Sequence, residues 1–393
     1  MFVSRAGAAR PFSGLRIPMP SDIDVSSLPA PAQKLLGPGA PLPMRLMAAR
    51  GIVPGLKPAD IVQVLCVLAE SDDPEIHKLA NATLDALPPP ILTGALNGDL
   101  PASAIDRIAR AHPNHHDVLA ALLRMPRIGR DTLEHAAQIA DERSGELIAT
   151  NEQLMLANPT VIEALYMNRN VRMSTADRLV ELAVRNGIEL GIPAYKEAAQ
   201  AITNELIPEP TEEPTYDDLM FAEAERLADA TGSLSDDEDT HELDEEGQEK
   251  VRSKFVPLHV LITQLTVTQK IRRAMLGSAA ERLLLVRDPN RLVATAAVKS
   301  PMMRDAEAAQ ISASRSVSED VLRIIAQNRE FVRHYRVKLN LVSNPRTPFT
   351  FAARLLPHLR DNDVRALAKS KNVSGAIVQA ARQQLSRKQN KGA

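Results

Sequence analysis

The sequence predicts an all-α fold built from helix pairs, and three observations lead to this prediction. Aromatic residues make up 3% of the chain and tryptophan is absent, while the hydrophobic content is 44%, so a core must come from aliphatic side chains. Segments rich in alanine and leucine favour helix over sheet. Apolar residues recur at steps of three and four, as in amphipathic helices, and short polar or proline-containing breaks separate these segments.

Several predicted helices begin with a polar residue followed by proline. Aspartate and asparagine are good N-caps, because their side-chain oxygens accept free N–H groups of the first turn. Proline is favoured at the first helical position. The four copies are Asp73-Pro74, His112-Pro113, Asn158-Pro159 and Asp288-Pro289. Their prolines are 39, 46 and 130 residues apart, and 130 is close to three steps of 43.

A second pattern marks a helix end, a short break and the start of the next helix. Four segments carry it: 123–128, 165–171, 298–303 and 341–347. Val171 and Met303 are 132 residues apart, which is three steps of 44, and Thr347 follows Met303 by one further step of 44. Both patterns therefore indicate a repeating helix pair of roughly 43 residues.

A helix pair of this length resembles the HEAT and armadillo repeats, whose period is about 40–47 residues. The resemblance covers residues 58–393 apart from one acidic stretch. It implies an α-solenoid, in which stacked helix pairs form an extended concave binding surface. The alternative is an irregular helical bundle in which the spacing is a coincidence.

Four segments are expected along the chain. The proline-rich residues 1–57 are expected to form a disordered or extended N-terminal arm, and a targeting segment is the alternative for its first residues. Residues 58–204 are predicted to be an N-terminal helical-repeat region. Residues 205–249 are predicted to be an acidic disordered insert with one short helix over 217–228. Residues 250–393 are predicted to be a basic C-terminal helical-repeat region.

The net charge of −2 conceals a strong segregation of charge. Residues 205–249 hold 1 Lys/Arg and 18 Asp/Glu, which gives −17, and residues 250–393 hold 27 Lys/Arg and 9 Asp/Glu, which gives +18. A basic surface of this size indicates an anionic partner. We expect the acidic insert to cover this surface reversibly, because exposed charges are screened over ~8 Å at physiological salt.

The candidate partner-binding residues are basic side chains of the last third: Arg329, Arg333, Arg336, Lys338 and Arg346. Arg329, Arg333 and Arg336 have helical spacing, which would place them on one face. Arg346 follows the break at Asn344-Pro345. The alternative interpretation is an ordinary solvated helix face.

The sequence contains no recognisable motif for catalysis or cofactor binding. It has no glycine-rich phosphate loop, no Gly-x-Ser-x-Gly motif and no His-Glu-x-x-His motif. Histidines 112, 115 and 116 are interpreted as polar residues at a helix start. Cys66 alone can form neither an internal disulfide nor a cysteine-based metal site. We therefore expect no catalytic residue, no cofactor and no metal ion.

The expected function is a non-enzymatic protein-interaction scaffold, whose basic C-terminal half binds an acidic protein partner. A nucleic-acid-binding helical-repeat protein is the first alternative, because clustered cations release counterions from phosphates, although few aromatic residues are present for base stacking. An enzyme on a HEAT-like fold is the second alternative. No stretch approaches the ~20 apolar residues of a membrane span, and the low cysteine content favours a reducing, cytoplasmic location.

Overall fold

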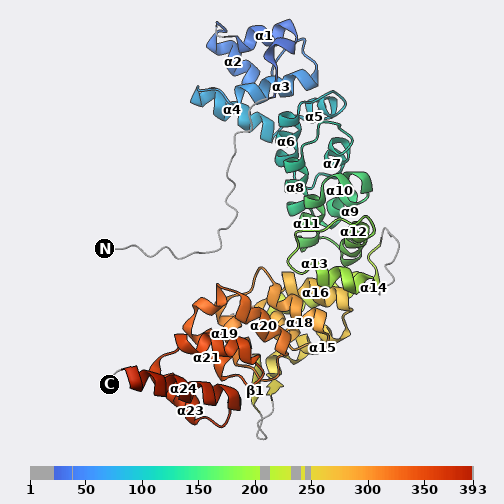
Figure 1. Cartoon of the computed structure of the whole chain (residues 1–393). Coiled ribbons are helices and arrows are strands. Elements are labelled where there is room, and N and C mark those ends of the chain that lie inside the picture. The colour runs from blue at the N-terminus through green and yellow to red at the C-terminus, as the bar shows by residue number, and fades with distance from the viewer. Residues whose placement is uncertain (1–21, 38, 204–212, 232–239, 244–248, 392–393) are drawn as a thin grey trace. The chain divides into compact units, whose positions relative to one another are not determined.

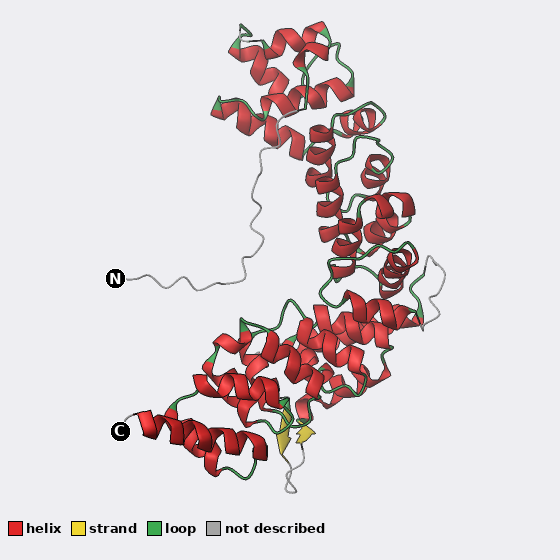
Figure 2. Ribbon diagram, viewed as in Figure 1, coloured by secondary structure: helices red, strands yellow, loops and turns green. Residues whose placement is uncertain are grey.

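The structure is a computed structural model that describes residues 22–37, 39–203, 213–231, 240–243 and 249–391 (Figure 1). In this part of the chain, 24 α-helices and four short 3-10 helices accompany one two-stranded sheet (Figure 2). The predicted all-α fold class is confirmed. Internal contacts divide the chain into unit 1, Met1–Ile139, and unit 2, Ala140–Ala393.

Unit 1 is a set of short helices around an aliphatic core, in which Val62, Leu65 and Ile76 are fully buried. Its described elements are η1 (Val25–Ser27), α1 (Ala30–Leu36), α2 (Leu42–Ala49), α3 (Pro58–Leu68), α4 (Pro74–Asp85), α5 (Pro89–Leu96), α6 (Ala102–Ala111), α7 (His116–Leu122) and α8 (Arg130–Ile139). Helices two apart in the sequence pack together: α2 on α4, α3 on α5, α4 on α6 and α6 on α8.

Helices α1 and α2 lie within the segment that we expected to be a disordered or extended arm. That expectation does not hold for the described part of residues 1–57. Each helix has a proline in its first turn, Pro31 and Pro43, where proline favours a helix start instead of interrupting a helix. Ala32 is fully buried, so α1 contributes to the core of unit 1. Residues 1–21, where a targeting segment was the alternative, lie outside the described residues.

Unit 2 contains the later helices and the sheet. Its elements up to the sheet are α9 (Glu142–Ala149), α10 (Glu152–Ala157), α11 (Pro159–Met167), α12 (Met173–Arg185), α13 (Tyr195–Ile202), α14 (Tyr216–Thr231), β1 (His241–Leu243) and β2 (Glu249–Val251). The elements after the sheet are η2 (Ser253–Phe255), α15 (Val256–Gln264), α16 (Val267–Leu276), α17 (Ala279–Leu285), α18 (Arg291–Lys299), α19 (Asp305–Ala313), α20 (Glu319–Gln327), η3 (Phe331–Arg333), α21 (Tyr335–Ser343), α22 (Phe349–Leu355), η4 (Leu356–His358), α23 (Asp361–Lys369) and α24 (Gly375–Lys391).

Alternate helices of unit 2 also pack together. Helix α18 contacts α16 and α20, α19 contacts α17 and α21, and α22 contacts α24. Successive helices joined by short loops run back and forth. The loops after α19, α21 and α23 therefore lie at one end of these helices, and the loops after α18, α20 and α22 lie at the other end.

Two described pieces of the predicted disordered insert are folded. Helix α14 contains the predicted short helix over 217–228 and packs against α12, α15 and α17. Strands β1 and β2 pair antiparallel, with His241 opposite Val251. The expectation of disorder does not hold here, because Phe221 and Asp218 supply buried contacts that composition does not reveal. The rest of the insert lies outside the described residues.

The two sequence patterns have different outcomes. Asp73 and Asn158 directly precede α4 and α11, with proline at the first helical position as predicted. In the other two copies the helix begins later, at Arg291 and at His116, because the proline lies in the turn before the helix. All four predicted breaks lie between consecutive helices: α7 and α8, α11 and α12, α18 and α19, and α21 and α22.

Candidate functional site

Several helices of unit 2 end in the same polar turn. The first residue after the helix is an asparagine or a serine, and its side-chain oxygen accepts the backbone N–H two residues further on, at 2.9–3.4 Å. The six residues are Asn168, Ser300, Ser314, Asn328, Asn344 and Ser370. This turn satisfies a backbone donor locally and directs the chain away from the helix axis.

Hydrogen bonds from these turns connect one loop with the next. The Asn344 amide donates to the carbonyl oxygens of Ser312 at 3.0 Å and Ser314 at 2.7 Å. Two residues further on, Nη1 of Arg346 lies 3.3 Å from the carbonyl oxygen of Val317. The loops after α19 and α21 are therefore held side by side.

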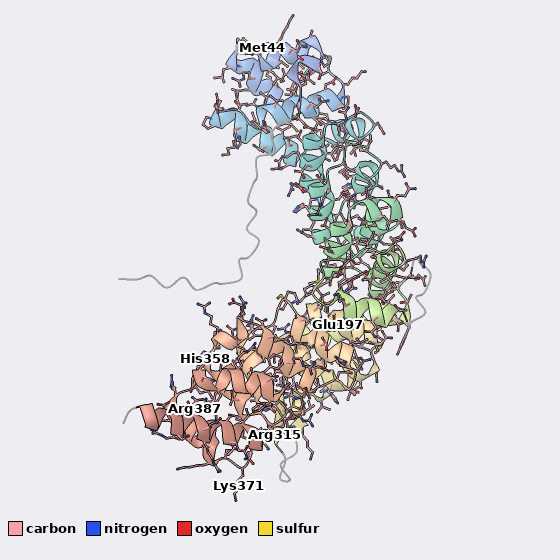
Figure 3. The ribbon with its side chains drawn as sticks, in the orientation of Figure 1. Met44, Glu197, Arg315, His358, Lys371 and Arg387 are labelled. Atoms are coloured by element: carbon pink, nitrogen blue, oxygen red, sulfur yellow. The ribbon has the colours of Figure 1, made fainter. Side chains whose placement is uncertain are left out.

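Three loops at this end of unit 2 form the candidate site, which we call the loop row: residues 314–317, 344–347 and 370–373. The third loop lies beside the second, because these loops lead into α24 and α22, and the two helices pack together. Figure 3 shows Arg315 and Lys371 on the same side of the unit, with His358 on the other side.

Each loop of the row carries one cation and no carboxylate. The cations are Arg315, Arg346 and Lys371, and all three residues are exposed. Arg315 and Lys371 have no ion-pair partner among the described residues. Neighbouring cations create a positive potential that attracts anions. The loop row therefore has the chemistry to bind carboxylate or phosphate groups.

A carboxylate of the acidic insert already lies on the first loop of the row. Glu249, in β2, accepts hydrogen bonds from Ser316 Oγ at 2.7 Å and Ser314 Oγ at 3.2 Å, and its Oε2 lies 3.5 Å from Nε of Arg287. Burial alone would raise the pKa of Glu249, but Ser316, Arg287 and Ser314 lower the pKa below its ordinary value. Glu249 is therefore an anion at neutral pH, bound by the hydroxyls and the guanidinium around it.

The structure does not place the predicted arginines on one helix face. Arg329 lies in the turn after α20, Arg333 ends η3, and Arg336 is in α21. The backbone is extended at His334, between Arg333 and Arg336, and this breaks the helical spacing that the prediction assumed. The interpretation of a single helical face is therefore wrong.

The remaining two candidates also separate. Lys338 lies in α21, half-buried, whereas Arg346 follows the end of that helix opposite to Arg333. A helix of nine residues is about 13 Å long. Of the five candidates, Arg346 is the one in the loop row, and the role of all five in partner binding stays a prediction.

Sequence reasoning missed Arg287, Arg315 and Lys371 as members of the site. A sequence signal was present for Arg315 and Lys371. Each directly follows a helix-ending serine, within the segments Ser314–Val317 and Ser370–Val373. Comparing these segments with 344–347 reveals the shared turn. No such signal exists for Arg287, whose relation to the loop row depends on tertiary contacts.

Three arginines of the basic segment are buried and cannot contact a partner: Arg272, Arg273 and Arg282 are 0%, 2% and 3% exposed. Arg282 forms a bidentate pair with Glu307, at 2.8 and 2.9 Å. Arg273 donates to Glu281 at 2.7 Å. These pairs connect α16, α17 and α19 and are structural parts of the helix packing.

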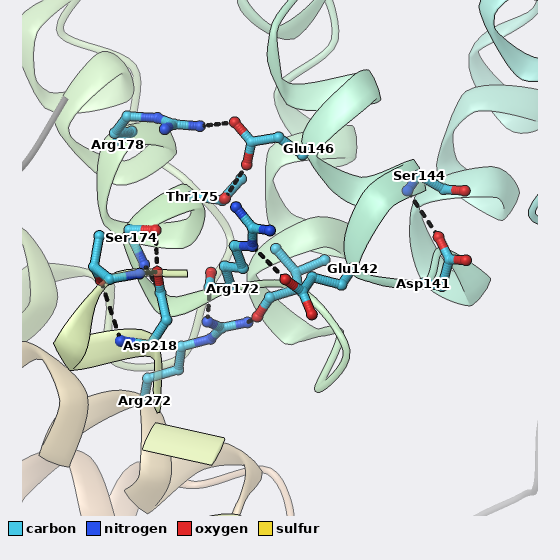
Figure 4. A network of polar contacts seen from close by, with 12 residues as sticks. Asp141, Glu142, Ser144, Glu146, Arg172, Ser174, Thr175, Arg178, Asp218 and Arg272 are labelled. Atoms are coloured by element: carbon cyan, nitrogen blue, oxygen red, sulfur yellow. Dashed lines mark hydrogen bonds and ion pairs between the residues drawn. The ribbon is translucent and has the colours of Figure 1, made fainter. Parts of the chain in front are cut away.

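Arg272 has carbonyl oxygens as partners instead of a carboxylate. Its three guanidinium nitrogens donate, at 2.9–3.1 Å, to the carbonyls of four residues in and after α11: Tyr166, Asn168, Val171 and Arg172. Figure 4 shows Arg272 with its partner Arg172. The guanidinium carbon also lies 5.1 Å from the centre of the Phe221 ring in α14, a distance typical of a cation–π contact. Burial lowers the pKa of Arg272. This arginine holds the loop between α11 and α12 against α16.

The described residues contain no group of His, Cys, Asp and Glu side chains that could hold a metal ion. Burial raises the pKa of the Cys66 thiol to about 12, so the thiol is protonated at neutral pH and is a poor nucleophile.

None of the helices in the described ranges is both long and apolar enough to cross a bilayer. Comparison of the chain with protein-family models, with curated proteins and with solved structures gave no match.

Proposed function

We propose that this chain is a non-enzymatic interaction scaffold built on HEAT-like helical repeats, and that its loop row binds an acidic segment of a partner protein. One observation carries the proposal: three neighbouring loops each present a cation without a carboxylate, and the first of them holds Glu249. A surface with this repetition fits an extended ligand that bears several acidic groups.

The repeat architecture is supported by helix packing and by the helix-ending turns. Helices two apart in the sequence pack together in both units, as they do in stacked helix pairs. The turn residues Ser314, Asn344 and Ser370 end the alternate helices α19, α21 and α23 and are 30 and 26 residues apart. We therefore propose that these turns mark equivalent positions of successive helix pairs, with a step shorter than the roughly 43 residues predicted from the sequence.

An acidic peptide fits the loop row better than a nucleic acid does. Packed helices are about 8–10 Å apart, and residues two or three apart in an extended peptide are about 7–10 Å apart. One peptide can therefore bring an acidic side chain to each loop. The loops contain hydroxyl, amide and cationic groups but no aromatic side chain on which a base could stack.

Charge reversal in the loop row tests this proposal. The triple variant R315E/R346E/K371E should bind a fluorescein-labelled oligoglutamate peptide at least about tenfold more weakly, because each exposed ion pair contributes up to about 1 kcal/mol and tenfold corresponds to about 1.4 kcal/mol. The control R329E/R333E/R336E changes the net charge equally and should alter the affinity less than about threefold. Fluorescence anisotropy at low and at physiological salt measures both.

Three other results would count against the proposal. Equal losses in the two triple variants would show that net charge, and not the loop row, holds the peptide. A loss confined to R329E/R333E/R336E would favour the residues first predicted from the sequence. Duplex DNA that binds more tightly than the peptide and is released by R315E/R346E/K371E would favour the nucleic-acid alternative.

A further inference from the structure

The donors that contact Glu249 also make contacts with groups outside the insert. Nε of Arg287 donates to Ser316 Oγ at 3.1 Å, and its Nη1 donates to the Leu283 carbonyl at 2.6 Å. The hydroxyls of Ser314 and Ser316 are 2.9 Å apart. The Arg287–Ser316 bond joins the loops after α17 and α19, and none of the three contacts involves the insert.

The position of this arrangement favours a bound carboxylate. The side chain of Arg287 is 12% exposed and that of Glu249 is 27% exposed, so their contact is partly shielded from water. Charge-assisted hydrogen bonds are stronger than neutral ones. Arg315, between the two serines, is exposed, and a longer acidic ligand can continue from here along the loop row.

The strand that supplies Glu249 belongs to a small hairpin. Strands β1 and β2 are three residues long and form a two-stranded sheet, which Arg252 extends by donating its N–H to the Thr240 carbonyl at 2.9 Å. A two-stranded hairpin is marginally stable by itself. Its place on unit 2 therefore depends on contacts such as that of Glu249, and a competing carboxylate can replace it.

We infer that Arg287, Ser314 and Ser316 form a carboxylate-binding subsite of the loop row, which Glu249 occupies in competition with an acidic side chain of the partner. This inference rests on the proposed function and specifies its ligand group, a glutamate or aspartate carboxylate. The inference also specifies how partner binding is regulated, because a partner must displace the β1–β2 hairpin before the partner can contact the whole loop row.

The variant E249Q tests the competition, because it keeps the shape of the side chain and removes its charge. A site that is occupied internally about nine-tenths of the time binds its ligand about tenfold more weakly than a free site. We therefore expect full-length E249Q to bind an oligoglutamate peptide about tenfold more tightly than the wild type, as measured by calorimetry. The matched control E242Q, at an exposed residue of β1, should stay within about twofold.

Two further measurements test whether the gain in affinity arises at this subsite and whether Glu249 holds the hairpin. In the background S314A/S316A, which lacks both hydroxyl donors, E249Q should no longer increase the affinity. Hydrogen exchange of the amides in 240–243 and 249–252 should become faster in E249Q, while exchange in α19 and α21 stays unchanged. Unchanged exchange in the hairpin would show that Glu249 does not hold it, and would overturn the inference.

The outcomes separate this inference from the proposed function. Equal peptide affinity in the wild type and E249Q, with binding still lost in R315E/R346E/K371E, would overturn the competition and leave the proposed function intact. A gain in E249Q that persists in S314A/S316A would place the internal carboxylate elsewhere. Absence of peptide binding in every variant would contradict the proposed function and the competition together.

Discussion

Arginine side chains of the C-terminal segment occupy opposite environments. Arg272 is fully buried against four carbonyl oxygens, whereas Arg315 is exposed in the loop row. A buried guanidinium without a carboxylate is tolerated when carbonyl oxygens satisfy its donors. Residues of the same type therefore have different roles: Arg272 is a structural member of the core, and Arg315 is available to a ligand.

Replacement of Arg272 tests its structural role. We expect R272M to lower the free energy of unfolding by about 3–5 kcal/mol, because the variant leaves buried carbonyl oxygens without donors. The control R315M, at an exposed position, should change it by less than about 0.5 kcal/mol. Urea unfolding followed by circular dichroism measures both. A loss of less than about 1 kcal/mol in R272M would show that the carbonyls find other donors.

Two helices of this fold, α6 and α12, are capped at their N-termini by side chains from other segments of the chain. Helices α6 and α12 have no capping side chain at their own N-caps, Pro101 and Arg172. Asp22 accepts the N–H of Ala102 at 2.8 Å, and Asp218 accepts the N–H of Ser174 at 2.8 Å. Each aspartate therefore caps a helix that is distant in sequence, and connects its own segment to that helix.

Replacement of Asn344, the residue that ends α21, tests whether this helix end is joined to that of α19. Asn344 is 5% exposed and its side chain makes three hydrogen bonds, two of them to the last turn of α19 and the loop that follows. N344A should cost about 2–4 kcal/mol of stability, because buried carbonyl groups lose their donor. The exposed control N372A should cost less than about 0.5 kcal/mol. Thermal and urea unfolding compare the two variants, and equal costs would contradict a role in joining the loops.

At the scale of the whole molecule, part of the acidic insert belongs to the fold. Helix α14 places Phe221 within 5.1 and 5.2 Å of the guanidinium groups of Arg272 and Arg273, and Asp218 receives hydrogen bonds from Ser174 in α12. The segregation of charge therefore has two consequences. Some acidic residues serve the packing of unit 2, and Glu249 lies on the basic loops.

The pH dependence of stability tests the role of α14. Burial alone would raise the pKa of Asp218, but hydrogen bonds from Ser174 and Thr215 lower it below the ordinary value. Because folding lowers this pKa, the carboxylate stabilises the fold at neutral pH, and its contribution is lost as the pH falls below about 4. We expect D218N to be less stable than the wild type at neutral pH, with a difference that shrinks under acidic conditions.

The exposed residue Asp229 of the same helix provides the control, and D229N should match the wild type throughout. Thermal unfolding between about pH 3 and 7 follows all three proteins across the ordinary range of a carboxyl pKa. A difference between D218N and the wild type that stays constant with pH would show that the charge of Asp218 does not stabilise the fold.

Local patterns were sufficient for the all-α class, for all four helix breaks and for the helix starts at Asp73 and Asn158. Helix formation depends on neighbours within about four residues, and capping depends on a few residues at the end, so this information is present in short segments. The same patterns did not reveal α1 and α2, because proline in a first turn resembles proline in a loop.

Tertiary packing alone decided which charges are buried and which face a ligand. Composition identified the basic segment, but long-range contacts bury Arg272, Arg273 and Arg282 and leave Arg315 exposed. The subsite of Glu249 joins loops after α17 and α19 with a strand of the insert, which are remote from each other along the chain. Such a site depends on helix packing and not on local spacing, and it becomes visible only in the folded molecule.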